Sequence, residues 1–356
     1  MAASGTTGAG AGDGGALFAA WLAGRRPRIE DYISGHLPAP VEGQGTEADL
    51  AHYLYDPLAR FTRSGGKRTR PALVLLGCEA VGGSPERALA AAAAIESFQS
   101  AALVHDDIAD EGEMRRGQPC VYRTEGIGVA VNVGDLALTE VIGGVLADPA
   151  LDDARRLRVM RELVEMERRT LEGQALDLGW VRDGRWDVSV SDYLRMASHK
   201  TAYYSAVTPL TVGAVCGGGT DGQVDALGAF GMDAGLAFQL QDDLLNLVGD
   251  AQAQGKDFRS DITEGKRTMI ACWALGRLPG AQRDELLGIL SSHATDATTL
   301  ERAVDLMEGA GAVDAVRSYA RELADSAKGR LKGIELAGDA RAVLESMADF
   351  FVERRG

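Results

Sequence analysis

Apolar residues recur at spacings of three and four along nearly the whole chain, and this pattern is the strongest constraint on its fold. Such spacing is typical of helices that bury one face, whereas the alternation typical of half-buried strands is almost absent. Clusters of Gly and Pro separate the periodic segments, as expected of turns between helices. The pattern predicts an all-α protein with helices at residues 16–22, 87–105, 151–171, 190–196, 226–247, 268–275, 283–293, 298–309, 312–331 and 339–355.

The organisation of the chain indicates one large domain after a short tail. The sequence has 356 residues, of which 46% are hydrophobic, and this is enough for a large core. No polar linker divides its middle, so residues 16–356 are predicted to form a single domain. Residues 1–15 are rich in Gly, Ala, Ser and Thr and lack the basic start and apolar centre of a signal peptide. They are therefore predicted to be a disordered tail.

Charge and cysteine usage exclude several classes of protein. Lys and Arg number 37 against 52 Asp and Glu, a net charge of −15, which would repel nucleic acid at long range. Four cysteines without CxxC spacing argue against structural zinc or disulfides and fit a cytoplasmic location. No apolar run reaches the roughly 18 residues that a membrane helix needs, so no integral membrane segment is expected.

Two acidic clusters each follow an apolar, helix-like run. The first is Asp106-Asp107-Ile108-Ala109-Asp110, in which the first and last residues are four apart and share one helix face. The second is Asp242-Asp243-Leu244-Leu245-Asn246. Carboxylates at the end of an apolar helix suit Mg²⁺, which takes one or two of them together with waters and substrate phosphates. One such cluster alone is more often a solvated helix face, but two that could face each other favour a metal site.

Concentrated cations in this acidic chain are the third feature. They lie in the segment RSGGKRTRP at residues 63–71 and in Arg115-Arg116-Gly117, and Lys256 and Lys266 follow the second acidic cluster. A Gly pair lets the backbone approach a ligand closely, and Arg can hold phosphate oxygens as a bidentate fork. Each basic segment alone could be a solvated turn. Together with the acidic clusters, they indicate a metal-bridged polyphosphate site.

The ordered series of motifs resembles the trans-type isoprenyl diphosphate synthases, the polyprenyl synthetase family, and most of all its bacterial geranylgeranyl diphosphate synthases. Between residues 65 and 268 the chain contains, in the family's order, GGKRTRP, LVHDDIADEGEMRRGQP, EGQALDL, HKTA, FQLQDDLLN, GKDFRSD and GKRT. The resemblance implies a single all-α bundle around a central apolar cavity, the isoprenoid synthase type I fold. It also implies a homodimer packed through helices near the first acidic cluster, and a prenyltransferase that joins isopentenyl diphosphate to allylic diphosphates.

The resemblance implies roles for the acidic motif residues. Three Mg²⁺ ions would be held by Asp106, Asp110 and Asp242, with Asp107 and Asp243 as supporting carboxylates. The family more often has Asp where this chain has Asn246. Because Asp242 is the implied ligand of that motif, activity is still expected.

Further roles follow for the residues that would hold the substrates. The diphosphate of the allylic substrate would contact Arg115, Lys200 and Lys256. The diphosphate of isopentenyl diphosphate would contact Gly66, Lys67, Arg70, Gln99 and Arg116. Gln99 also lies seven residues before Asp106, hence on nearly the same helix stripe. With Lys200, the catalytic candidates are Thr201 and Gln239 at the reacting centre, and Gln174, Asp177 and Lys266 occupy supporting positions.

Product length is expected to depend on the helix that carries Asp106. Ala102 lies one turn before it, about 6 Å away at 1.5 Å per residue, and Ala101 is the next residue down. The resemblance implies that bulky residues there stop chain growth, so the two alanines favour the twenty-carbon product, geranylgeranyl diphosphate. The helix is rich in alanine throughout, so small residues are expected there in any case. Phe98, about 12 Å below Asp106, is a candidate for the cavity floor, and farnesyl or longer products stay open.

Two other functions are alternatives. A class I terpene cyclase shares the all-α fold and a DDxxD motif, but it has no use for a second diphosphate site such as GGKRTRP. A non-catalytic regulatory subunit would typically have lost one of the acidic or basic motifs, and all of them are present here.

Overall fold

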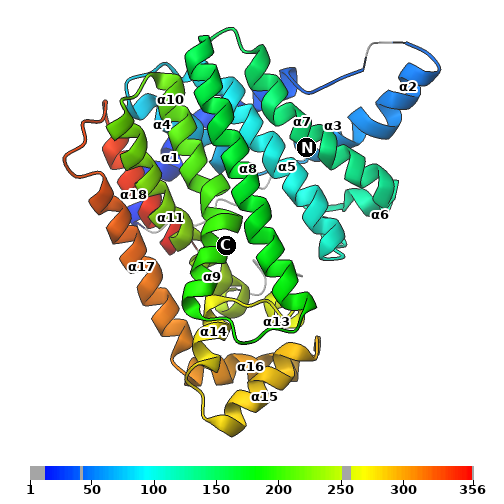
Figure 1. Ribbon diagram of the computed structural model, residues 1–356, viewed down its shortest axis with the longest axis vertical. Helices are drawn as coiled ribbons and strands as arrows, with labels where there is room; N and C mark the ends of the chain where they lie inside the picture. The colour runs from blue at the N-terminus through cyan, green and yellow to red at the C-terminus, as the bar shows by residue number, and fades with distance from the viewer. Residues whose placement is uncertain (1–12, 41–42, 251–257, 355–356) are drawn as a thin grey trace, which may run out of the picture.

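The structure, a computed structural model, describes residues 13–40, 43–250 and 258–354, and almost all regular structure within them is helical (Figure 1). The first part of the chain forms η1 (Asp13–Gly15), α1 (Ala16–Gly35), α2 (Thr46–Leu50), η2 (Ala51–Tyr55), α3 (Asp56–Arg63), α4 (Thr69–Ala80), η3 (Pro85–Ala88) and α5 (Leu89–Ala109). A short hairpin of β1 (Met114–Arg115) and β2 (Gln118–Pro119) follows. The middle contains α6 (Val121–Glu125), α7 (Ile127–Ala147), α8 (Asp153–Arg182), α9 (Val190–Ala197), η4 (Ser198–Val207), α10 (Thr208–Gly217) and α11 (Asp221–Val248).

The C-terminal part consists of shorter helices and two long ones. These are α13 (Ser260–Thr263), α14 (Met269–Leu275), α15 (Gly280–Ser291), α16 (Ala297–Gly309), α17 (Ala312–Arg330) and α18 (Ala340–Glu353). Figure 1 shows α14, α15 and α16 together at one end of the molecule, while α17 runs back along it toward α18. The prediction of an all-α fold is confirmed, and each helix expected from the periodicity is present.

The periodicity did not predict α3, α4, α7 and α10. In α4 and α10 nearly every residue is buried, so no polar face marks a helical period. These two helices cross in close contact. A Cβ on Gly77 would lie 2.3 Å from the carbonyl oxygen of Leu210, and one on Gly213 would lie 2.0 Å from that of Val74. Glycine lowers helix propensity, but here it lets the two backbones touch.

The long helix α11 connects the two main hydrophobic clusters of the fold. Its first half contributes Val224, Leu227 and Phe230 to a cluster with α4, α5, α10 and α18. Its second half contributes Leu240 and Leu244 to a cluster with α14, α16 and α17. This continuity is what a single domain over residues 16–356 would need. The second acidic cluster lies on α11 within the second of these hydrophobic regions.

Three residues of the predicted tail, Asp13–Gly15, are helical and contact the last helix. Residues 1–15 were expected to be a disordered tail, but Asp13–Gly15 form a turn of 3₁₀ helix, η1, so the end of the predicted tail is wrong. Ser346 on α18 donates to the carbonyl oxygen of Gly14 (2.6 Å), and a Cβ on Gly15 would lie 2.8 Å from the Phe350 Cα. Close backbone packing on α18 therefore orders these residues, and residues 1–12 lie outside the described part of the chain.

The segment η4 is a π-helical stretch of ten residues inside an otherwise α-helical run from α9 to α10. Such wide turns are rare and occur mostly at functional sites. The neighbouring helices make room for it with glycines: a Cβ on Gly173 of α8 would lie 2.2 Å from the Lys200 nitrogen, and one on Gly235 of α11 would lie 2.8 Å from the Ala202 Cα. The glycine of the EGQALDL motif is therefore explained by backbone contact with η4.

Replacing Gly173 with Ala is expected to destabilise the protein and displace η4. A methyl group cannot fit 2.2 Å from a backbone nitrogen, so α8 and η4 must separate, at a cost of about 1–3 kcal/mol. The melting temperature should fall by about 2–4 °C per kcal/mol. The matched control is Gly179→Ala on the same helix, where a Cβ meets nothing within 4 Å and better helix propensity should stabilise slightly. Equal melting temperatures for the two variants would contradict the contact.

Candidate active site

Lysine side chains link the first acidic cluster to α8 and η4. Lys266 Nζ lies 3.2 Å from Asp110 Oδ1 and 3.5 Å from Asp177 Oδ2 of α8. Asp177 also accepts a hydrogen bond from Lys200 of η4. Burial would raise the pKa of Asp177, but Lys200 and Lys266 outweigh it, so that pKa is lowered. The pKa of Lys200 is raised, because its pairing with Asp177 outweighs the effect of burial, so both groups are held charged.

Polar contacts continue from η4 to the second acidic cluster. Thr201 Oγ1 donates to Gln239 Oε1 of α11 (2.7 Å), and Gln239 Nε2 donates to Asp243 Oδ1 (2.8 Å). The predicted reacting-centre residues Thr201 and Gln239 are thus bonded to each other. Since Lys200 and Thr201 are neighbours, an unbroken series of contacts joins the two acidic clusters.

Asp106, the first carboxylate of the first cluster, is held by a neutral side chain. Its Oδ1 accepts a hydrogen bond from Gln174 Nε2 of α8 (2.7 Å). Burial raises the pKa of Asp106, while the charges of Lys200 and Lys266 act in the opposite direction. A desolvated carboxylate with a neutral hydrogen-bond donor is ready to be stabilised by a cation.

The second Asp of each cluster is buried and holds a neighbouring side chain. Asp107 is 1% exposed and its Oδ1 accepts bonds from Arg115 Nε (2.8 Å) and Nη2 (2.6 Å). Asp243 is 5% exposed and its Oδ2 accepts a bond from the Tyr193 hydroxyl (2.6 Å). Burial raises the pKa of both Asp243 and Tyr193. The roles of Asp107 and Asp243 as supporting carboxylates stay a prediction.

The outward Asp of the second cluster, Asp242, has an ionic partner that the sequence did not predict. Its carboxylate accepts a hydrogen bond from Arg354 Nη2, which lies at the end of α18. Four residues further along α11, Asn246 Nδ2 lies 3.1 Å from Ser260 Oγ, and its Oδ1 accepts a bond from the Asp261 nitrogen (3.3 Å). Asn246 therefore helps hold the segment that begins α13.

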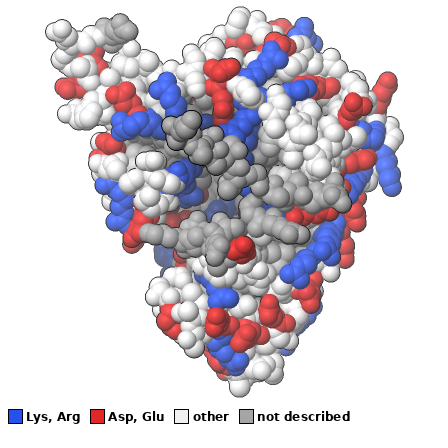
Figure 2. All heavy atoms as spheres, turned by 180° about the vertical axis from the view of Figure 1, so that it is seen from behind, with Lys and Arg blue, Asp and Glu red and all other residues white. Residues whose placement is uncertain are grey.

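A basic cavity of about 350 Å³ adjoins the acidic clusters. All five residues predicted for the diphosphate of isopentenyl diphosphate line it, namely Gly66, Lys67, Arg70, Gln99 and Arg116, together with Arg115 and Arg354. The whole chain carries a net charge of −15, and Figure 2 shows Lys and Arg side chains interspersed with Asp and Glu over one face. The cavity therefore concentrates positive charge where the rest of the protein repels anions.

Local backbone geometry places the cations in this cavity. Arg116 and Gly117 both have positive φ (52° and 76°), as the two central residues of a tight hairpin between β1 and β2 require. A Cβ on Gly66 would lie 3.3 Å from Arg116 Nη2, so the Gly-rich turn lets that guanidinium approach the backbone. Arg70 is oriented by the hydroxyls of Ser205 (3.1 Å) and Tyr204 (3.0 Å).

Neighbouring charges also tune Lys67. Desolvation lowers its pKa first, and the charge of Arg354 lowers it further, while Asp242 acts in the opposite direction. An ammonium beside other cations gains most from an anion that relieves their repulsion.

The residues predicted to set product length all lie on α5. Phe98 is 3% exposed and packs edge-on against Tyr204, with ring centroids 5.7 Å apart. Ala101 of α5 is fully buried in a cluster with Val133 of α7, while Ala102 is half-buried. Their effect on chain length stays a prediction, and Lys256 lies outside the described residues.

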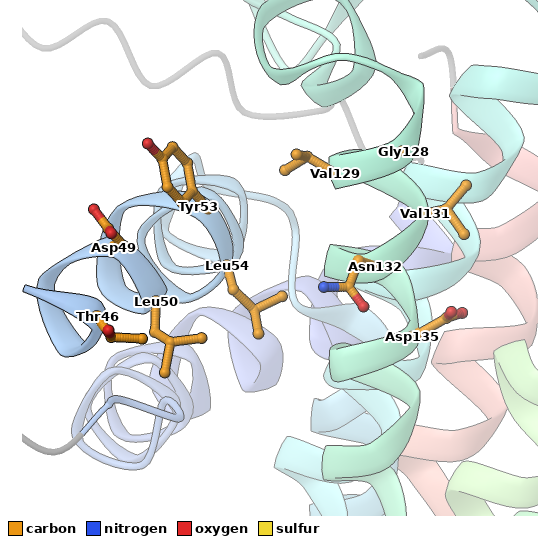
Figure 3. Close-up of a pocket in the computed structure, with 10 residues that line it drawn as sticks. All are labelled: Thr46, Asp49, Leu50, Tyr53, Leu54, Gly128, Val129, Val131, Asn132 and Asp135. Carbon is orange, nitrogen blue, oxygen red and sulfur yellow. The ribbon is translucent and has the colours of Figure 1, made fainter.

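A separate hollow of about 470 Å³ lies between α2–η2 and α7. Figure 3 shows Leu50, Tyr53 and Leu54 on one side and Val129 and Val131 on the other. None of the predicted site residues lines it.

Sequence reasoning missed three contributors to the site. Arg354 and Tyr193 act through partners 112 and 50 residues away, and no local motif marks either of them. The buried pair of Arg68 and Glu96 (6% and 2% exposed) lies at the wall of the basic cavity. A glutamate in the middle of an alanine-rich apolar helix was the available signal for that pair.

Comparisons with known proteins identify relatives of the chain. The polyprenyl synthetase family matches residues 51–307, which is more than half of the chain. The short chain isoprenyl diphosphate synthase of Methanothermobacter thermautotrophicus is 38% identical over 291 residues, covering 82% of this chain and 87% of the relative.

Two solved structures have the same fold. The geranylgeranyl pyrophosphate synthetase of Pyrococcus horikoshii aligns with a TM-score of 0.85 at 32% identity, covering 95% of this chain and 98% of the other. The geranylgeranyl pyrophosphate synthase of Corynebacterium glutamicum, solved with isoprenyl diphosphate and magnesium, aligns with a TM-score of 0.79 at 29% identity over 96% and 98%. The protein described here is therefore a member of the polyprenyl synthetase family.

Proposed function

We propose that the protein is a Mg²⁺-dependent, chain-elongating prenyltransferase. It condenses isopentenyl diphosphate with the allylic diphosphates dimethylallyl, geranyl and farnesyl diphosphate, and geranylgeranyl diphosphate is its product. The observation that carries this proposal is that two different sites adjoin: paired acidic clusters on α5 and α11, which can hold a diphosphate only through metal ions, and a basic cavity beside them. A cyclase would need only the first of these.

The residues present fit Mg²⁺ at the acidic clusters. Asp106, Asp110 and Asp242 provide the hard oxygen donors that Mg²⁺ prefers. Within residues 13–40, 43–250 and 258–354, no three His, Cys, Asp or Glu side chains converge closely enough to form a metal site by themselves. This suits an ion that takes only one or two carboxylates and completes its shell with water and substrate phosphate. Three ions, as the resemblance implies, would share these carboxylates.

The side chains divide the reaction between them. When bound, Mg²⁺ would neutralise the charge that develops on the leaving diphosphate. Lys200, held charged by Asp177, would contact that diphosphate. The Thr201 hydroxyl and the Gln239 amide oxygen line the reacting centre, where oxygen atoms can face a carbocation. The basic cavity orients the second diphosphate so that the double bond of its substrate lies next to that cation.

A product assay tests the proposed function. Purified protein, Mg²⁺ and labelled isopentenyl diphosphate are mixed separately with five-, ten- and fifteen-carbon allylic diphosphates, and the dephosphorylated products are separated by chain length. A single twenty-carbon alcohol is expected from each starter. A fifteen-carbon product would show that another residue closes the cavity. Products longer than twenty carbons would show that Phe98 does not form the end of the cavity. No incorporation with any starter would favour the cyclase or the regulatory subunit.

The proposal includes a homodimer, supported by an exposed apolar seam. Leu157, Val164, Leu171 and Leu178 recur every seven residues along α8, and all four are exposed, Leu171 to 66%. By length and composition alone, two helical stretches of the described residues, Pro85–Ala109 and Ile127–Ala147, could span a membrane, which the sequence analysis did not expect. The first is 61% buried inside the fold, but the second, α7, is only 33% buried. A second copy would cover both α7 and the α8 seam, and we retain the prediction of a cytoplasmic location.

Replacing Leu171 with Asp is expected to convert the dimer to monomers. A charge at the most exposed seam position would be desolvated at the interface, which is strongly unfavourable. Sedimentation velocity of the purified protein measures the change, with Leu17→Asp on α1, another exposed leucine (47%), as the matched control. A dimer that persists in both Leu171→Asp and Val164→Asp would place the interface elsewhere.

A further inference from the structure

The described chain ends with an arginine that is buried although it follows the last helix. Arg354 is 7% exposed and lies directly after α18, where the backbone becomes extended (φ −61°, ψ 146°). Long charged side chains are seldom buried to this extent unless they are paired. Its burial therefore indicates that groups on another helix hold it in place.

Three neighbouring residues of α11 hold Arg354. Its guanidinium lies 4.0 Å from the centre of the Phe238 ring, and its Nη2 donates to the Phe238 carbonyl oxygen (3.2 Å). Gln241 Nε2 donates to the Arg354 carbonyl oxygen (3.0 Å), and the Asp242 carboxylate forms the ion pair. Apart from that ion pair, these contacts fix the arginine in place without using the metal-site carboxylate.

Arg354 belongs to the basic cavity as well as to the acidic cluster. It lines the cavity with Lys67 and Arg70, and its charge helps lower the pKa of Lys67. Its Nε is buried and has no hydrogen-bond partner among the described residues. A buried donor without an acceptor is costly, so an anion in the cavity would be favoured on this ground too.

Asp242 cannot hold Arg354 and a divalent ion equally well. Its side chain is 42% exposed, so an ion can reach it from solvent. The guanidinium occupies the same carboxylate that the proposed function assigns to Mg²⁺. Two cations that need one carboxylate compete, and the competition weakens the binding of each.

We infer that Arg354 exchanges one partner for another when a divalent cation binds. Without the cation it pairs with the Asp242 carboxylate, and with the cation bound to Asp242 it pairs with a diphosphate in the basic cavity. The inference rests on the proposed function, because it takes Asp242 as a metal ligand. Release of Arg354 from Asp242 adds one more donor to the cavity, and an anion there holds Arg354 away from the metal site. Metal and diphosphate therefore each strengthen the binding of the other.

The test measures metal binding without turnover. Mn²⁺ replaces Mg²⁺, and its free concentration is followed by electron paramagnetic resonance in the full-length wild type, Arg354→Gln, Asp242→Asn and Arg341→Gln. In the absence of any anion, Arg354→Gln is expected to bind Mn²⁺ roughly five- to tenfold more tightly than the wild type, since a charge-assisted contact no longer competes. Asp242→Asn should bind it more weakly. Arg341→Gln is the matched control: Arg341 lies on α18 and donates to the Leu331 carbonyl oxygen (2.7 Å), away from α11.

Hydrogen exchange of the last turn of α18 gives an independent readout. In the wild type, Mn²⁺ alone should raise exchange in the peptide that contains residues 350–354, and added inorganic diphosphate should lower it again. In Arg354→Gln neither addition should change exchange there, and titration calorimetry should show that diphosphate binds several-fold more weakly than to the wild type.

The outcomes separate this inference from the proposed function. If Asp242→Asn weakens Mn²⁺ binding but Arg354→Gln binds as the wild type does, the exchange is wrong and the metal site stands. If Arg341→Gln tightens binding as much as Arg354→Gln, general loosening of α18 explains the effect and the inference fails. If Asp242→Asn leaves Mn²⁺ binding unchanged, the metal assignment of Asp242 fails, and the exchange fails with it.

Discussion

Asp106→Asn is expected to lower kcat at least about 10²-fold while leaving the protein folded. Asn keeps the shape of the side chain and an Oδ1 that can still accept the hydrogen bond from Gln174. It removes the negative charge that would hold Mg²⁺ against the leaving diphosphate. Loss of one preorganised electrostatic contact typically costs 10² to 10³ in kcat, and a metal ligand contributes at least that much. Steady-state turnover with labelled isopentenyl diphosphate measures the loss.

The stability of the same variant distinguishes loss of catalysis from loss of fold. Burial raises the pKa of Asp106, so its charged form is disfavoured in the folded protein. The stability that this group contributes is present below its unfolded pKa and is lost as the pH rises through its folded pKa. At pH 8 without metal, Asn should therefore give a melting temperature equal to or above that of the wild type. Asp225→Asn, at an exposed Asp of α11, should change neither turnover nor melting temperature. A lower melting temperature for Asp106→Asn would attribute the lost activity to the fold instead.

Local sequence predicted the helices and the chemical character of the site. Helical periodicity placed Asp106 and Asp242 at the ends of apolar runs, and a carboxylate there has few ways to be stabilised except by a cation. The spacing of Gln99 and Asp106 likewise placed both on one stripe of α5, and the structure has them on the basic and acidic sides of one site. Features that depend only on the residues of a single helix can therefore be predicted from the sequence of that helix.

The contacts between distant segments could not be predicted in this way. Arg354 reaches Asp242 only because α18 packs along α11, and nothing near residue 354 in sequence indicates that packing. Arg115 was expected on the substrate diphosphate, yet in the structure it is bonded to Asp107, which lies eight residues before it. The hairpin between β1 and β2 brings that arginine back to its own acidic cluster, and the ligand-binding role of Arg115 stays a prediction.

Lys67→Ala is expected to impair the use of isopentenyl diphosphate much more than the use of the allylic substrate. Removing one cation from a diphosphate site loses a charge-assisted contact, which corresponds to about a 10- to 100-fold fall in kcat/KM for isopentenyl diphosphate. The KM for the allylic substrate should change little, because its diphosphate is bound at the acidic clusters. Lys67→Arg should restore most of the activity, and Lys332→Ala, at an exposed lysine beyond α17, is the matched control.

A merely structural role of Lys67 would change the KM values of both substrates alike, whereas a role in one binding site would change only one of them. In the structure Lys67 lines the basic cavity, while the acidic clusters lie on α5 and α11 beside it. Equal losses for both substrates would mean that one site binds both diphosphates, which would contradict the division proposed here. A variant that converts an allylic diphosphate at the wild-type rate, with no need for isopentenyl diphosphate, would instead indicate a cyclase. A selective loss is the result expected only of an enzyme that binds a second diphosphate in order to lengthen the first substrate.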